Sequence, residues 1–117
     1  MKGFSKEQII SAVEDAKAEA KQSAQKFFQE RLGGVDQYAC GFAWVNIHGV
    51  RSNSKEGKAL IEAGFRKSYQ PGILQLWDPS DMPVQNVDTK EAGAMAFAKY
   101  FNALFPDVQI YAGSRLD

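Results

Sequence analysis

The sequence predicts an α+β fold in which a long amino-terminal helix precedes a four-stranded antiparallel sheet with helices packed on one face. Segments with apolar residues every three or four positions alternate with shorter segments in which every second residue is apolar. Glycine or proline separates these segments, and their order is helix, strand, helix, strand, strand, helix, strand. No linker interrupts the 117 residues, so we expect a single domain, with 1–34 as the helix and 40–117 as the core.

The first element is a helix that begins after Ser5, because Ser5 and Gln8 form a capping box. A stripe of small apolar residues follows, and Gly33 with Gly34 ends the helix. The members of the stripe are Ile9, Val13, Ala16, Ala20, Ala24 and Phe27. Its alanines permit close approach to a flat surface or to another helix, so we expect this helix to pack on a sheet or on a neighbouring subunit.

The next elements are a strand ending at His48 and a helix that we expect Asn53 and Glu56 to cap. Gly64 ends this helix, a second strand covers about 65–69, and a turn at 71–72 leads to a third strand at 73–77. After a loop, Asp88 and Glu91 form a further capping box for a helix that Pro106 closes, and a last strand begins near 108.

This order is the split βαβ, or ferredoxin-like, arrangement (βαββαβ). Right-handed crossovers are expected to place the first and third strands side by side at the centre, running parallel to each other. One face of the sheet is expected to be buried beneath the helices, through Val45, Ile47, Leu60, Leu74, Leu76, Phe97 or Phe101, Val108 and Ile110. The open face is expected to carry Phe42, Trp44, Asn46, His48, Ile73, Gln75, Trp77, Gln109 and Tyr111.

Composition limits the partners and the compartment. Fourteen basic and fourteen acidic residues give no net charge, so a nucleic acid or an anionic membrane must be held by a local patch. Cys40 is the only cysteine and cannot form an internal disulfide, which suits a reducing compartment. The amino terminus lacks the apolar region of a signal peptide and no stretch is long enough to span a bilayer, so we expect a cytoplasmic protein without membrane partners.

The strongest candidate site is an anion site at the start of the two later helices. If the central strands are parallel, these helices begin at the same rim and their positive dipole ends converge. The residues expected there are Arg51, Ser54, Lys55 and Lys58 on one side and Gln85, Asn86, Thr89 and Lys90 on the other. The segment GVRSNSKEGK at 49–58 is not a Walker loop, because its glycines lack the spacing of that motif. Capped helices with solvated lysines remain the alternative interpretation.

The open face is the second candidate. Trp44 and Trp77, with Tyr111 nearby, resemble in position the base-stacking aromatic residues of nucleic-acid-binding sheets of this topology, although no RNP-type motif occurs. The alternative is that the first helix or a second copy of the chain covers this face. Either cover requires the aromatic residues to serve packing or self-association.

His48 is a weak catalytic candidate, because a general base needs an orienting carboxylate, for which Asp78 or Asp81 is available. A hydrogen-bonded histidine at a strand end is the default interpretation. One histidine and one cysteine cannot complete a structural zinc site, and neither a metal nor a cofactor is expected.

The segments CGFAWVNI, RSNSKEGKALIEAGF, LQLWDPS, VQNVDTKEAGAMAFA and AGSRLD together resemble a group of small bacteriophage-encoded proteins without an assigned activity. The resemblance covers the chain from about Cys40 onwards. It implies a viral protein acting in the cytoplasm of a bacterial host. Small phage proteins of similar fold include inhibitors of host defence and nucleotide-handling proteins.

The leading hypothesis is a non-enzymatic protein that binds a phosphate-bearing ligand, either a nucleotide or a nucleic acid, at the converging helix starts. The alternative is a structural or host-inhibitory protein that binds a host protein or assembles as a homo-oligomer through its open face or first helix. An enzyme acting on a nucleotide-like substrate through His48 is the third hypothesis.

Overall fold

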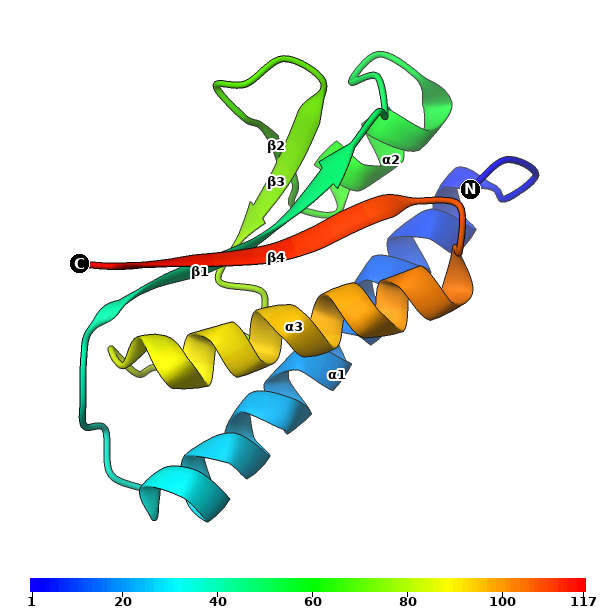
Figure 1. Cartoon of the computed structure of the whole chain (residues 1–117). Coiled ribbons are helices and arrows are strands. Elements are labelled where there is room, and N and C mark those ends of the chain that lie inside the picture. The colour runs from blue at the N-terminus through cyan, green and yellow to red at the C-terminus, as the bar shows by residue number, and fades with distance from the viewer.

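A computed structural model describes all 117 residues and confirms the α+β architecture (Figure 1). The elements are α1 (Lys6–Leu32), β1 (Gly41–His48), α2 (Lys55–Glu62), β2 (Arg66–Lys67), β3 (Ile73–Trp77), α3 (Val87–Leu104) and β4 (Gln109–Leu116). The strands form one sheet in the order β2-β3-β1-β4. This is the strand order of the split βαβ fold, with α1 added in front.

The central strands run in opposite directions, so the prediction of a parallel pair was wrong. Residues of β1 and β3 pair antiparallel, from Trp44 opposite Trp77 to His48 opposite Ile73. The crossover through α2 returns β2 in the direction of β1, and the β2–β3 hairpin then reverses β3, which is inserted between them. Every neighbouring pair in the sheet is therefore antiparallel, and α2 and α3 begin at opposite ends of it.

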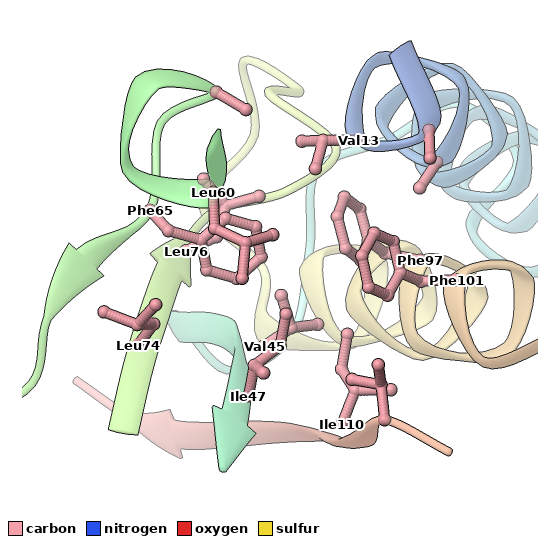
Figure 2. Packing of buried hydrophobic residues seen from close by; sticks show 14 of the residues in the cluster. Val13, Val45, Ile47, Leu60, Phe65, Leu74, Leu76, Phe97, Phe101 and Ile110 are labelled. Atoms are coloured by element: carbon pink, nitrogen blue, oxygen red, sulfur yellow. The ribbon is translucent and has the colours of Figure 1, made fainter. Parts of the chain in front are cut away.

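All three helices lie on one side of the sheet. The helix α1 packs against α3 and α2 rather than against the outer face, so it does not cover the predicted open face (Figure 1). Its alanines Ala16, Ala20 and Ala24 are fully buried, which confirms that the small-residue stripe serves close helix packing. In Figure 2, Val13 of α1 lies beside Phe97 and Phe101 of α3, above the sheet.

The two faces of the sheet divide as the alternation predicts. On β1 the inward residues Ala43, Val45 and Ile47 are buried, and the residues between them are half-exposed. The predicted core residues of the later elements also join this cluster: Leu60, Leu74, Leu76, Phe97, Phe101 and Ile110 (Figure 2), together with Val108. The core therefore lies wholly between the sheet and the helices.

Two of the three expected caps were displaced. The Ser5–Gln8 capping box has both of its hydrogen bonds, but α2 is capped by Ser54 rather than Asn53, through a 3.0 Å bond from the Gly57 N–H. A Cβ on residue 57 would lie 2.0 Å from the carbonyl oxygen of Arg51, so the glycine allows this tight start. The cap of α3 lies two residues before the expected Asp88, because Asn86 accepts the N–H of Thr89 and the helix begins at Val87.

Candidate functional site on the open face of the sheet

The predicted anion site is divided between the two ends of β1. The segment Arg51–Lys58 follows the carboxyl end of β1, whereas Asn86 forms a bridge with Cys40 at its beginning. Eight residues of strand, about 26 Å at 3.3 Å per residue, separate the two groups. The convergence of helix starts was therefore a wrong prediction: Ser54 and Thr89 do not share a rim.

The start of α3 already holds a carboxylate of the protein itself. Asp36, in the connector after α1, accepts hydrogen bonds from the backbone N–H of Gln85 at 2.8 Å and of Asn86 at 3.0 Å. It also accepts the Asn86 side-chain amide at 2.9 Å. The Asn86 amide, followed by the backbone N–H of Gln85, holds the pKa of Asp36 below its usual range. An external phosphate at Gln85 and Asn86 would have to displace this carboxylate.

The start of α2 is partly satisfied in a similar way. The Ser54 hydroxyl is occupied by its capping bond and donates to the Arg51 carbonyl at 2.6 Å, while Lys55 lies 3.9 Å from the Glu56 carboxylate. Lys58 is exposed and has no ion-pair partner. Arg51 lines a cleft of about 470 Å³ between the β1–α2 loop and the β2–β3 hairpin, which Lys67 also lines.

The open face carries a cluster of three aromatic rings on the two central strands. The Trp44 and Trp77 centroids lie 5.1 Å apart, and Phe42 lies 6.0 Å from Trp77. Trp77 is 47% exposed, and its indole N–H donates to the Gln75 amide oxygen at 2.5 Å. Gln75 donates in turn to Asn46 at 2.9 Å. This chain of hydrogen bonds holds the exposed indole in one orientation across the sheet.

Trp44 lies across a glycine on the neighbouring edge strand. Gly113 is its register partner on β4, and a Cβ built there would lie 2.6 Å from the Trp44 Nε1 atom. A side chain at this position would displace the indole ring. The glycine therefore leaves room for the Trp44 indole, whose plane is tilted by 44° from that of Trp77.

Two cations border the Phe42 end of this cluster. Arg115 Cζ lies 5.6 Å and Lys90 Nζ 5.5 Å from the Phe42 ring centroid, within the range of cation–π attraction. Lys90 also donates to the Gly41 carbonyl at 3.0 Å. No acidic residue occupies an outward position on β1, β3 or β4. A neutral protein thus presents a locally basic aromatic face.

His48 and Tyr111 lie at the other end of the face. Their rings meet edge to face at 5.4 Å, and Tyr111 is exposed. The prediction that Asp78 or Asp81 orients His48 was wrong, because the Asp78 N–H donates to the Ala43 carbonyl at the far end of β1. A cleft of about 280 Å³ brings His48 near Asp107, but that carboxylate accepts from the amino group of Met1.

Asp36, Lys67 and Gly113 were not among the predicted site residues. Asp36 and Lys67 act through contacts with distant parts of the chain, which local periodicity does not register. A signal for Gly113 was present, because the alternation of Gln109 and Tyr111 continues through Gly113 to Arg115. The sequence predicted only where the last strand begins, near 108, and the structure shows that β4 extends to Leu116.

No three His, Cys, Asp or Glu side chains gather closely enough to hold a metal ion. None of the helices has the length and apolar character required to cross a membrane. Comparison with protein-family models, with curated proteins and with solved structures gives no match for this chain. The resemblance of its later segments to phage-encoded proteins therefore stays a prediction.

Proposed function

We propose that this chain binds single-stranded nucleic acid on the open face of its sheet, with bases stacking on Trp44 and Trp77. The single observation that supports this most strongly is the pair of indoles on the two central strands, Trp77 exposed and Trp44 partly buried beside it, with no helix over them. Sheets of this topology bind RNA by stacking two or three bases on aromatic residues of the same two strands. Stacking tolerates any base, so the proposal requires no sequence-specific pocket.

Cations at both ends of β1 supply phosphate contacts for such a strand. Arg115 and Lys90 lie beside Phe42, whereas Arg51 and Lys67 line the cleft beyond the other end of the sheet. A nucleic-acid strand laid along β1 would meet the aromatic rings with its bases and positive charge at both ends. Arg51 and Lys90, both expected to bind phosphate, thus keep that role in the proposal without a shared site.

The experiment is titration of short single-stranded DNA and RNA homopolymers, followed by tryptophan fluorescence and by anisotropy of a labelled oligonucleotide. Trp77→Ala should weaken binding by about 1–3 kcal/mol, since that is the range for one lost stacking contact. Trp77 suits the test because its indole makes only one hydrogen bond and is half-exposed. The matched control is Tyr69→Ala, which removes an exposed aromatic ring from the β2–β3 hairpin.

Equal losses for Trp77→Ala and Tyr69→Ala would contradict the proposal, as would failure of the wild-type protein to bind any DNA or RNA tested. Binding of a mononucleotide as tightly as of an oligonucleotide would favour a nucleotide ligand instead. Circular dichroism of each variant establishes that the fold is retained. The result therefore separates loss of the stacking surface from loss of structure.

The second candidate is a protein interaction surface, either for a host protein or for another copy of the chain. Tryptophan, tyrosine and arginine dominate binding energy at protein interfaces, and the open face carries Trp77, Tyr111 and Arg115. In that case Trp77→Ala would abolish capture of a protein partner, and neither the wild type nor the variant would bind oligonucleotides. The enzyme hypothesis rests on His48 alone, and His48→Ala would have to abolish a measured turnover.

A further inference from the structure

We propose that the outer edge of β4 pairs with the same edge of a second copy of the chain, giving a two-fold symmetric dimer with one continuous sheet. This proposal shares Arg115 with the proposed nucleic-acid site but does not depend on that site, because the backbone edge and the groove lie to the side of the Trp44–Trp77 pair.

The edge strand β4 presents a long row of unpaired backbone groups. It is eight residues long, contains no proline and pairs with β1 without a bulge. At the other edge β2 has only two residues, so that edge is short. Long regular edges without charged or proline interruptions are sites where further strands add. Arg115 is the only charged residue within β4.

The phase of the ladder shows which groups are free. The Asp117 N–H bonds the Cys40 carbonyl at 3.0 Å, and hydrogen-bonded pairs alternate along an antiparallel ladder. The odd-numbered residues of β4 therefore direct their backbone groups towards β1. The groups that point away from the sheet belong to Ile110, Ala112, Ser114 and Leu116.

An apolar groove lies directly beneath this edge. It has a volume of about 440 Å³ and runs between α3 and β4. The residues that line it are Glu91, Met95, Ala98, Ile110, Tyr111 and Ala112. Met95 is 58% exposed, more than Leu104 of the same helix at 43%. A strand added to β4 would cover this side chain.

One register satisfies both the backbone and the side chains. Antiparallel partners point to the same face, so a two-fold axis at Gly113 pairs Ile110 with the partner subunit's Leu116. Leu116 is 66% exposed in the single chain and would lie over the groove beside Met95. On the open face the same axis sets Tyr111 opposite the partner subunit's Arg115, a cation–π pair that the symmetry makes twice.

The occupant is a second copy because each chain carries both halves of the contact. The groove of one chain accommodates Leu116 of the partner subunit, and Tyr111 contacts Arg115 of the partner subunit. A two-fold interface requires this self-complementarity. An axis at Ala112 would instead set Arg115 opposite Gln109 and leave Leu116 beyond the paired strand. The Gly113 register therefore uses more of the exposed apolar surface.

The test is the mass of the full chain in solution over a range of concentrations, by light scattering and sedimentation. The wild type should dimerise and dissociate on dilution, and Met95→Lys and Ala112→Pro should each abolish the dimer. Proline at 112 removes an outward N–H and keeps the bonds to β1, as tolerated on edge strands. The control, Leu104→Lys, places the same charge on a 43% exposed apolar residue of α3 and should leave the dimer intact.

Crosslinking tests the register. In a Cys40→Ser background, Ala112→Cys mixed with Ser114→Cys should form a disulfide-linked pair on mild oxidation, because these positions face each other across the axis. Neither variant should crosslink alone. A single-chain mass at every concentration would overturn the proposal, even if the edge accepted a strand of another protein. A dimer that survives both Met95→Lys and Ala112→Pro would place the interface elsewhere and also overturn it.

Discussion

The carboxylate of Asp36 holds Asn86, the residue that caps α3, through its backbone N–H at 3.0 Å and its side-chain amide at 2.9 Å. This contact ties the connector after α1 to the start of α3 and fills the helix start with an internal anion. The site that the sequence assigned to an external phosphate is thereby part of the fold.

Asp36→Asn is expected to lower the thermal midpoint at neutral pH. The folded state holds the pKa of Asp36 below its ordinary value of 3.8, so the stabilisation is present above that pH. It is lost as the pH falls through the lower folded-state pKa, and the variant and wild type should then converge. Thermal unfolding between pH 2 and 7 measures this, with exposed Asp15→Asn as the control. A constant difference at all pH values would contradict the linkage.

Asp78→Asn is expected to have the opposite effect. Burial raises the pKa of Asp78, against the opposing charge of Lys90, so the ionised carboxylate destabilises the fold at neutral pH. Stability from this group is greatest below the ordinary pKa of 3.8 and declines as the pH rises through the raised folded-state pKa. Asparagine also tolerates the φ of 48° at this position.

The variant should therefore unfold at a higher temperature than the wild type at pH 7 and lose this advantage in acid. Asp81→Asn, with the nearly identical φ of 49° but an exposed side chain, should gain less. A lower midpoint for Asp78→Asn at pH 7 would show that the carboxylate makes a favourable contact.

Gly113→Ala should destabilise the fold by about 1–3 kcal/mol, the usual cost of overpacking a filled site. The added Cβ would lie 2.6 Å from Trp44 Nε1, so the indole must move. Denaturant unfolding gives the change in the free energy of unfolding, and near-ultraviolet circular dichroism reports the change in the environment of the Trp44 indole. In a Trp44→Leu background the same substitution should cost less, because the clash is gone. An equal cost in both backgrounds would indicate a backbone effect.

Ser5→Ala should cost about 1 kcal/mol, because it removes the side chain that caps α1. Ser5 accepts the N–H of Gln8 at 3.1 Å, and Gln8 accepts the N–H of Ser5 at 2.8 Å. Ser11→Ala, on the exposed side of the same helix, removes a serine that makes no cap and should be neutral or slightly stabilising. Denaturant midpoints at equal slope compare the two, and equal effects would deny the cap its role.

Arg115→Ala should reduce the salt dependence of oligonucleotide binding. If Arg115 neutralises one phosphate of a single strand, the slope of log K against log salt falls in magnitude by about 0.7. Affinity for all sequences should weaken together, since a phosphate contact reads no base. Lys21→Ala, exposed on α1, is the control and should leave the slope unchanged. An unaltered slope for Arg115→Ala would remove this residue from the phosphate contacts.

The sequence by itself determined the elements and the two faces of the sheet. Capping at Ser5, the alanine stripe of α1 and the alternation along β1 depend on neighbours within a few positions, so local patterns recorded them. The residues of the open aromatic face were predicted for the same reason, since strand alternation assigns each side chain to a face.

Only the tertiary structure decided how these pieces meet. The direction of β3 relative to β1 follows from the crossover and the hairpin together, and it separates Arg51 from Lys90. The bond between Asp36 and Asn86 joins residues 50 positions apart, and it fills the helix start. Local periodicity contains no information on such pairings, because they depend on how complete elements pack.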